Sequence, residues 1–402
     1  MEPSSSNVAI FDEIHRNPIN NPIDLLSKEG VMIEKECYCV HYNKILDDLK
    51  PLPCCSLRLE DEWYLVWIKV IQLEDGTIFW PLELFNLNSR KLELQIGSEN
   101  TNYIISVATF PKDDISSTKK FIYCWGQTFI IYELQKNKQI KEALSINNKG
   151  SINAVIVFED KYNEIGENNG IYVLMTFDIL ETLSLYRIDQ TSDGKWKEQL
   201  VRTIVGFPET RTYTMNFFHD EIRKKTSIIS NFFCSYGKSF MKMLDLKQNS
   251  WGENAYPVSH NISSIDFLFK KRFDKQTGKE EIDRYLIYAQ KDGLVGTFNI
   301  DTLEKKARFL PDTNITQDLC LWNAGSNEEI NYLIVATHSN SYINILNFEG
   351  LEMIESQKSQ NQDKSMVSFI KIVQKDQNGK NIGKLISCYY LGGMHGQIEI
   401  HE

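Results

Sequence analysis

A pair made of one large residue and one polar residue recurs seven times along this chain. Each pair closes a stretch in which two apolar runs are joined by a short turn. The pairs are Phe85-Asn86, Tyr132-Glu133, Tyr186-Arg187, Leu244-Asp245, Phe298-Asn299, Leu346-Asn347 and His401-Glu402. Their spacings are 47, 54, 58, 54, 48 and 55 residues. A strand-based repeat of this length predicts a ring of four-stranded blades, an all-β, seven-bladed β-propeller. Six or eight blades remain open, because the first and fourth units are irregular.

The two inner strands of a unit are clearest in the fifth and sixth repeats. Residues 285–305 (YLIYAQKDGLVGTFNIDTLEK) and 332–350 (YLIVATHSNSYINILNFEG) place β-branched and aromatic runs around a few turn residues, which indicates a tight hairpin. A strand is predicted before each hairpin, at residues 53–59, 103–110, 151–158, 212–218, 262–269, 315–322 and 365–373. Weaker outer strands fit after the first six hairpins, for example at 90–97 and 306–312.

The seventh hairpin is followed by no outer strand, so we expect the N-terminal part of the chain to provide one. Residues 31–42 (VMIEKECYCVHY) are compatible with a strand and have no hairpin of their own. Pairing beside the last hairpin would close the ring non-covalently and cover an edge strand. The propeller is therefore expected to span residues 31–402. Residues 1–30 are predicted to be an N-terminal extension, partly flexible, with a short helix at 20–30 that begins at Asn21-Pro22 and ends at Gly30.

Charged insertions of variable length separate the first strand of a unit from its hairpin. They lie at residues 111–120, 159–170, 219–225, 270–284 and 374–381. In a propeller this connection always emerges on the same face. The sequence therefore predicts one face of short turns and an opposite face of long polar loops. Two interpretations stay open for these loops, tolerated insertions and a partner-specific surface.

Composition narrows the classes of partner. The chain has 44 basic and 54 acidic residues, a net charge of −10, which disfavours nonspecific attraction to nucleic acid or anionic membranes. No apolar stretch reaches the roughly 18 residues that a membrane-spanning helix needs, and the first residues lack the apolar core of a secretory signal. The eight cysteines form no CxxC motif, which favours reduced, buried thiols in a cytoplasmic or nuclear protein. Loops rich in Asn and Lys hint at a eukaryotic source with an AT-rich genome.

The fifth hairpin resembles the WD-repeat family of β-propellers. Asp292-Gly293, followed by LVGTFN and IDTLEK, looks like the family's DG turn, its third strand and the tail after it. With the hairpins aligned, the resemblance covers residues 31–402. No unit has the family's Trp-Asp, and the seven pairs stand in its place; the family's Gly-His is absent. Membership of this family implies an interaction scaffold within a multiprotein assembly.

Motifs that carry chemistry are mostly missing. Residues 235–239 (SYGKS) contain a GKS tripeptide, but Phe232 occupies the position where a phosphate-binding loop needs glycine. Asp266 and Asp318, in the first strands of adjacent units, are the candidates for a propeller hydrolase or esterase with axial carboxylates, and a structural hydrogen-bonding role is the alternative. The basic run at 270–272 is diluted by nearby acids, which predicts a solvated loop rather than a nucleic-acid site.

Five residues at or beside the hairpin turns of different units are predicted to gather at one mouth of the ring. They are Trp125, Phe177, Tyr236, His338 and His395. Rings at a mouth would anchor a partner peptide, and capping of the core is the alternative interpretation. A metal pair of His338 and His395 is a remote further alternative, because no carboxylate or cysteine lies near them in the sequence.

Taken together, these patterns favour a noncatalytic scaffold of a cytoplasmic or nuclear complex whose propeller faces bind other proteins. We expect no catalytic residue, metal, cofactor, small-molecule substrate or membrane insertion, and no direct nucleic-acid binding. A propeller enzyme is the main alternative, and a nucleic-acid-binding propeller is the third.

Overall fold

The computed structural model of this chain consists of β-strands joined by turns, and no helix occurs among the residues it describes. Those residues are 31–33, 55–59, 62–68, 71–72, 77–86, 88–89, 91–96, 104–110, 119–148, 150–166, 170–177, 182–208, 210–234, 239–274, 279–310, 316–323, 332–338, 342–358, 364–375, 381–391 and 395–401. The chain divides into two compact units. One comprises Met1–Pro51 with Ile262–Glu402, and the other comprises Leu52–Asn261.

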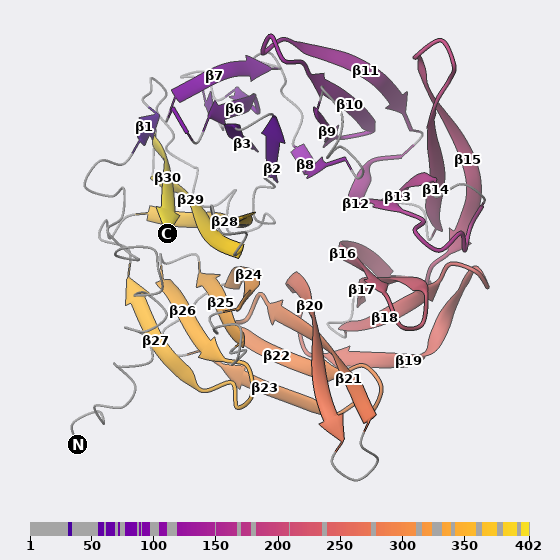
Figure 1. Cartoon of the computed structure of the whole chain (residues 1–402), viewed down its shortest axis with the longest axis vertical. Coiled ribbons are helices and arrows are strands. Elements are labelled where there is room, and N and C mark those ends of the chain that lie inside the picture. Colours follow the sequence, from indigo (N-terminus) through magenta and orange to yellow (C-terminus); the bar gives the residue numbers. More distant parts are fainter. Residues whose placement is uncertain are drawn as a thin grey trace. The chain divides into compact units, whose positions relative to one another are not determined.

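The unit Leu52–Asn261 contains four antiparallel sheets of four strands each (Figure 1). The first sheet has β2 (Cys55–Leu59), β3 (Glu62–Ile68), β6 (Leu82–Asn86) and β7 (Lys91–Ile96), and a small ribbon of β4 (Ile71–Gln72) and β5 (Ile78–Phe79) lies between β3 and β6 in sequence. The second has β8 (Ile104–Thr109), β9 (Lys119–Trp125), β10 (Thr128–Leu134) and β11 (Ile140–Asn147). The third has β12 (Ile152–Glu159), β13 (Ile171–Phe177), β14 (Thr182–Gln190) and β15 (Trp196–Val205). The fourth has β16 (Thr210–Asp220), β17 (Lys225–Cys234), β18 (Ser239–Asp245) and β19 (Ser250–Val258).

The other unit contains three four-stranded antiparallel sheets. One has β20 (Ile262–Asp274), β21 (Lys279–Gln290), β22 (Leu294–Asn299) and β23 (Lys305–Phe309). The next has β24 (Thr316–Asn323), β25 (Tyr332–His338), β26 (Tyr342–Asn347) and β27 (Met353–Lys358). The last has β28 (Lys364–Lys375), β29 (Asn381–Leu391), β30 (His395–His401) and, as its outer strand, β1 (Val31–Ile33).

The N-terminal segment lies where the sequence places it. β1 pairs antiparallel with β30, with Val31 opposite Ile398 and Ile33 opposite Gly396 (Figure 1). Residues 34–42 of the predicted strand and the predicted helix at 20–30 lie outside the described residues. The outer strand of the last sheet therefore comes from the other end of the sequence.

The large–polar pairs mark the third strand of every four-stranded sheet. Phe85-Asn86, Leu244-Asp245, Phe298-Asn299 and Leu346-Asn347 end β6, β18, β22 and β26. A register shift against the outer strand falls immediately before Phe85, Tyr132, Tyr186 and Leu346. A bulge at this position turns the strand sharply, because two residues then oppose one. In these four sheets the large residue of the pair therefore follows a β-bulge in the third strand.

Consecutive sheets within a unit pack against each other through apolar side chains. On β13, Val173 and Met175 belong to a core shared with the preceding sheet, which includes Phe129 and Ile131. The alternate residues of β13, Tyr172 and Leu174, belong to the core shared with the following sheet. A strand with both faces buried reads as a continuous apolar run, which is how this strand appears in the sequence.

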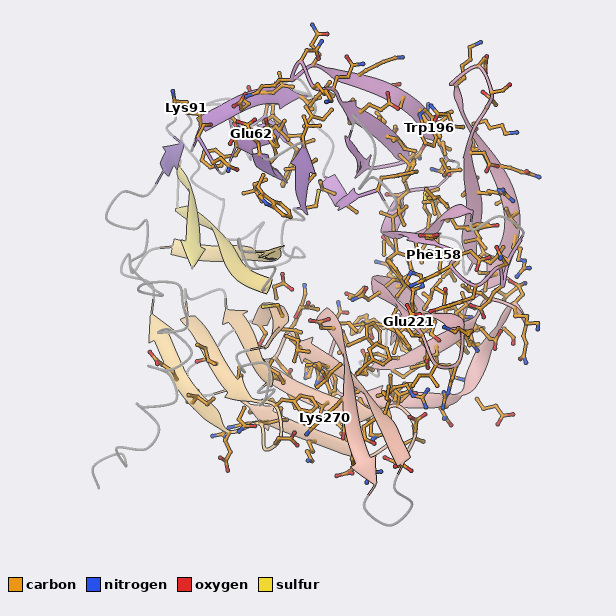
Figure 2. All side chains as sticks on the ribbon, in the orientation of Figure 1. Glu62, Lys91, Phe158, Trp196, Glu221 and Lys270 are labelled. Carbon is orange, nitrogen blue, oxygen red and sulfur yellow. The ribbon has the colours of Figure 1, made fainter. Side chains whose placement is uncertain are left out.

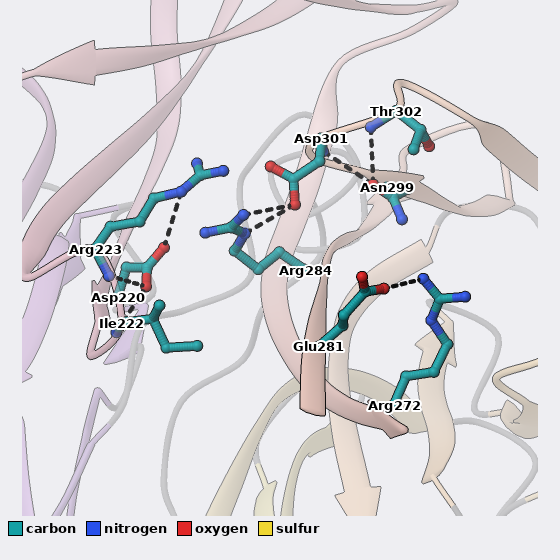
Figure 3. Close-up of polar contacts among 9 residues, drawn as sticks. All are labelled: Asp220, Ile222, Arg223, Arg272, Glu281, Arg284, Asn299, Asp301 and Thr302. Carbon is teal, nitrogen blue, oxygen red and sulfur yellow. Dashed lines mark hydrogen bonds and ion pairs between the residues drawn. The ribbon is translucent and has the colours of Figure 1, made fainter. Parts of the chain in front are cut away.

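One predicted loop is wrong. Residues 270–284 were expected to form a polar insertion, but 270–274 complete β20 and 279–284 begin β21. The two strands pair through Arg272 opposite Glu281, and these two residues form an ion pair (Figure 3). Arg272 makes a second ion pair with Asp283. Opposite charges that face each other across two strands stabilise their pairing. Charge alone therefore did not distinguish this ribbon from a loop.

Candidate interaction surface

Four of the five residues predicted to gather at a mouth lie at strand ends, and Tyr236 lies outside the described residues. Trp125 ends β9, Phe177 ends β13, His338 ends β25 and His395 begins β30. The side chain of Phe177 is 7% exposed and belongs to the core shared with the preceding sheet. For this residue, packing in the core accounts for the ring. Binding by the five residues stays a prediction.

Two of the predicted polar loops lie together in the unit Leu52–Asn261. We call the segments 159–166 and 219–226 the loop surface; they connect β12 to β13 and β16 to β17. The first is organised around Asp160, whose side chain is completely buried. Its carboxylate accepts hydrogen bonds from the backbone N–H groups of Glu164 at 2.8 Å, Ile165 at 2.7 Å and Gly166 at 3.3 Å. A carboxylate with three N–H donors fixes the loop in one conformation.

Asp220 organises the second segment in the same way. Its buried carboxylate accepts hydrogen bonds from the N–H groups of Ile222 at 3.1 Å and Arg223 at 2.9 Å (Figure 3). Lys224 has a φ of 49°, the left-handed conformation that closes such a turn. The turn spans 221–224, because β16 ends at Asp220 and β17 begins at Lys225. The side chain of Ile222 at its tip is 59% exposed.

Ionic and hydrogen-bonding contacts join the two segments to each other. Lys161 forms an ion pair with Glu221, and the carboxylate of Glu164 accepts a hydrogen bond from the N–H of Thr226. Figure 2 shows Phe158 and Glu221 on the neighbouring sheets that carry the two segments. The two contacts tie one loop to the other, so the loop surface is a joint feature of two sheets.

An aromatic layer lies beneath these contacts. The rings of Phe158 and Tyr172 stack with centroids 6.0 Å apart, and Phe158 lies 5.8 Å from Phe217. His219 packs edge-on against Phe217 at 5.6 Å and against Tyr162 at 6.1 Å. The loop surface is therefore supported from below by rings of β12, β13 and β16, an arrangement that favours rigid presentation.

Burial and charge shift the proton affinities of this surface. Burial raises the pKa of Glu164 and raises that of Tyr162 to about 12. The hydrogen bond from Lys161 lowers the pKa of Glu221. Burial, with a smaller effect from the charge of Lys161, lowers the pKa of His219, so the imidazole favours its neutral form.

The two predicted axial acids make backbone hydrogen bonds. Asp266 Oδ2 accepts one from the N–H of Leu321 in the adjacent sheet at 2.9 Å, and its Oδ1 accepts one from Phe267 at 2.8 Å. Asp318 Oδ1 accepts one from the N–H of Leu319 at 2.8 Å. The bond to Leu321 ties β20 to β24, a structural role of the kind given as the alternative to catalysis. Whether either acid takes part in catalysis stays a prediction.

The described part of the chain contains no cluster of side chains that could bind a metal ion. No group of three or more His, Cys, Asp or Glu residues is placed there to hold an ion. Cys55 and Cys320 are buried and are not in disulfides. Within the same residues no helix could cross a membrane.

The sequence predicts the two polar loops but does not predict the hydrogen bonds of Asp160 and Asp220 that hold them in place. Asp160 and Asp220 look like ordinary surface acids in a charged run. Their position was a usable signal, because each residue follows an apolar strand at the point where a turn begins. An Asp side chain at such a position accepts hydrogen bonds from the N–H groups of the residues that follow it. The contacts between the segments depend on which sheets are neighbours, which local sequence does not state.

Comparisons with known proteins bear on the fold. No family model and no curated protein matches the sequence. Among solved structures, the chain is similar to BBS1N in a complex with ARL6DN, with 10% identity, a TM-score of 0.52, and coverage of 88% of this chain and 92% of that one. It is also similar to Raptor from Chaetomium thermophilum, with 10% identity, a TM-score of 0.56, and coverage of 95% of this chain and 29% of that one. Both neighbours contain β-propellers, so the likeness supports a β-propeller fold for this chain.

Proposed function

We propose that this chain is a noncatalytic scaffold of a multiprotein complex, cytoplasmic or nuclear, that holds segments of partner proteins on its loop surface. The observation that carries the proposal is the joining of the two loops from different sheets. Burying the carboxylates of Asp160 and Asp220 carries a desolvation cost, which their hydrogen bonds to backbone N–H groups offset. These bonds hold each loop in its conformation. Such a fixed surface binds a partner with little loss of conformational entropy.

The exposed groups of the loop surface suit a protein partner. Ile222 offers an apolar contact, and the same two segments carry both signs of charge on Lys161, Glu221, Arg223 and Lys224. An apolar centre with a polar rim is the usual anatomy of a specific protein interface. One neighbour in structure, BBS1N, was crystallised with ARL6DN, and the proposal extends that kind of role to this chain.

The architecture we propose for this scaffold has seven blades. The seven four-stranded sheets would be the blades of one WD-repeat-like propeller, and β1 would complete the seventh. The turn at Asp292-Gly293, which resembles the DG turn of WD repeats, supports this assignment. Gly293 has a φ of 87°, and its N–H donates a hydrogen bond to the carbonyl of Gln290 at 3.1 Å.

The test is a native purification of the tagged chain from its own cells, with quantitative mass spectrometry of what remains bound. We expect a stoichiometric set of partners that is depleted by Ile222→Glu. The matched control is Leu92→Glu, which places the same charge at an exposed leucine of β7, far along the chain from both loops. A lone monomer, or partners retained by Ile222→Glu, would refute the loop surface as the binding site.

The turn residues predicted from sequence have a separate test in the same experiment. Trp125→Ala combined with Tyr236→Ala should weaken partner capture with an unchanged melting temperature. Partners retained in full by this double variant would remove the predicted mouth site and leave the loop-surface proposal standing.

A further inference from the structure

A second surface lies near the outer strands β15 and β19 of the unit Leu52–Asn261. We call Val205, Phe207, Phe240 and Trp251 the rim patch; they lie at the end of β15, in the link to β16, on β18 and on β19. The side chain of Val205 is 71% exposed, the largest value for a big hydrophobic residue in the described part of the chain. The three rings beside it are partly exposed. Val205 borders the rings through its backbone carbonyl, whereas its side chain lies on the face of β15 opposite to Ile204, which is buried in the core that Trp251 packs against.

The rings of the rim patch hold one another in place. Phe207 lies edge-on to Phe240 with centroids 5.3 Å apart and at 5.9 Å from Trp251. Beneath them Phe232, which is buried, lies 4.8 Å from Phe207 and 4.8 Å from Trp251. Each ring has only two side-chain torsions to fix, so a partner loses little affinity to ordering them.

The backbone beside Val205 is fixed by the same cluster. Trp251 Nε1 donates a hydrogen bond to the carbonyl oxygen of Val205 at 2.8 Å. Three residues earlier, the guanidinium of Arg202 donates to the carbonyl of Leu246. The exposed valine is therefore held on a strand end that is tied twice to the next sheet.

The ammonium group of Lys242 borders the rings and has no acidic partner among the residues that the structure describes. The ammonium of Lys242 lies 5.4 Å from the centroid of Phe207 and donates to the carbonyl oxygens of Gly252 at 3.0 Å and Glu253 at 3.5 Å. Within the described residues, no carboxylate oxygen lies at ion-pair distance from it. The rim patch thus combines an apolar surface with an uncompensated positive charge, in a chain whose net charge is −10.

We propose that the rim patch binds a short extended segment of a partner protein that carries an apolar side chain next to Asp or Glu. The apolar side chain would cover the exposed parts of the rings, and the backbone of the segment would run past the exposed Val205 at the end of β15. The acidic side chain would pair with Lys242, whose charge no group of this surface neutralises. The site is separate from the loop surface, and the proposal stands whether or not the loop surface binds a partner.

A random library of 12-residue displayed peptides, selected on the full chain, tests this proposal. We expect enriched peptides that combine a large apolar residue with an acidic one. A synthetic copy of the best peptide should bind Val205→Glu about tenfold more weakly or worse than wild type by fluorescence anisotropy. Leu200→Glu is the matched control, because it adds the same charge at a 51% exposed leucine of the same strand, and it should bind as wild type does.

The role of Lys242 is tested by a double-mutant cycle. Replacing the acidic residue of the peptide by its amide should weaken binding to wild type and leave binding to Lys242→Ala unchanged. Lys242→Arg should retain the acidic preference. Failure to enrich any peptide, equal binding to Val205→Glu, or an additive cycle would overturn the proposal. So would a homodimer in sedimentation that Val205→Glu dissociates, because the occupant would then be a second copy of this chain.

Discussion

Buried polar side chains have opposite effects on the stability of this protein, depending on whether they form hydrogen bonds. Asp160 is fully buried and accepts three N–H groups, so its burial holds a loop in place. Tyr288 is also fully buried, but its hydroxyl has no hydrogen-bond partner in the described structure. Its ring stacks on Phe298 with centroids 5.3 Å apart, and Gly296 leaves room for it, since a Cβ there would lie 2.4 Å from the hydroxyl oxygen. The ring contributes packing, and the hydroxyl carries a desolvation cost.

Removing that hydroxyl should stabilise the protein. We expect Tyr288→Phe to raise the free energy of unfolding by about 1 kcal/mol, because the phenylalanine keeps the ring and loses an unsatisfied buried group. Tyr64→Phe is the matched control, since the buried Tyr64 donates a hydrogen bond to Glu62 at 2.6 Å. This control should lower stability by about 1 kcal/mol in urea unfolding. A loss of stability in Tyr288→Phe would show that the hydroxyl has a partner in solution.

His219 should make stability depend on pH. Burial and Lys161 lower its pKa below the ordinary 6.5, so the folded chain binds this proton less tightly than the unfolded chain. The stabilisation from the neutral imidazole is complete above about pH 6.5 and is lost as the pH falls through the folded-state pKa. Urea unfolding at pH 7 and pH 5.5 should therefore show a smaller fall in stability for His219→Gln than for wild type.

Comparison with variants isolates this histidine from its neighbours. Glu164, whose pKa is raised, acts in the opposite direction with pH, so the prediction concerns the difference between His219→Gln and wild type. His260→Gln, which removes an exposed histidine outside the loop surface, is the matched control for the loss of an imidazole. Equal falls in stability for His219→Gln and wild type would contradict the prediction.

At the scale of the element, the polar member of four large–polar pairs, those that end β6, β18, β22 and β26, organises the turn to the outer strand. Asn86 Oδ1 accepts from Asn88 and Ser89, Asp245 Oδ1 accepts from Gln248, and Asn347 Oδ1 accepts from Glu349. The turns after Asp245 and Asn347 contain a residue at positive φ, Asn249 at 55° and Leu351 at 53°. In three sheets, those of β6, β18 and β26, a register shift near the end of the third strand is followed by a turn that a side-chain oxygen stabilises.

Asn299 is the pair residue whose turn is best defined. Its Oδ1 accepts hydrogen bonds from Asp301 and Thr302 at 2.9 Å each (Figure 3). Asn299→Ala should lower the free energy of unfolding by about 1–2 kcal/mol, because two N–H groups lose their acceptor. Asn299→Asp keeps the acceptor and should recover most of this loss in chemical denaturation. Asn137→Ala, in an exposed turn with one such bond, should cost below about 0.5 kcal/mol. A neutral Asn299→Ala would show that water replaces the side chain.

Elements were predictable from the sequence to the extent that they depend on local pattern. The strands 151–158 and 262–269 were predicted almost as β12 and the first part of β20, because alternating and continuous apolar runs report burial directly. The ribbon at 270–284 was missed, since its stability comes from charges on opposite strands. The bulges in the first strands, as between Ile152 and Ala154, left no signal, because an extra residue changes the register without changing the composition.

The candidate site was less predictable than the fold. The positions of the polar loops follow from where apolar runs stop, so the sequence predicts 159–170 and 219–225 among five charged insertions and leaves open whether they are tolerated insertions or a partner-specific surface. The ion pair of Lys161 with Glu221 joins residues of two sheets that are 60 positions apart. A contact of this kind depends on which loops face each other, and one sequence offers no evidence of that pairing.

At the scale of the whole molecule, the main feature is that residues from both ends of the sequence share one sheet. β1 and β30 are paired, so the sheet of β28, β29 and β30 has its fourth strand from the N-terminal side. Without β1, β30 would be the edge of its sheet, with a row of unpaired N–H and C=O groups. The N-terminal segment therefore contributes both to stability and to protection of an edge.

Deleting residues 31–42 should lower the melting temperature by several degrees, at roughly 2–4 °C for each kcal/mol lost. The loss has two sources, the ladder from Val31 to Ile33 and the newly exposed edge of β30. Deletion of 8–19, a segment of equal length outside the described residues, is the control in differential scanning fluorimetry and should leave melting unchanged. The exposed edge should also cause association of the 31–42 deletion in sedimentation, because an uncovered strand pairs with other chains. Equal melting temperatures for both deletions would mean that β1 adds nothing to the sheet in solution, and the proposal that it completes a seventh blade would fail with it.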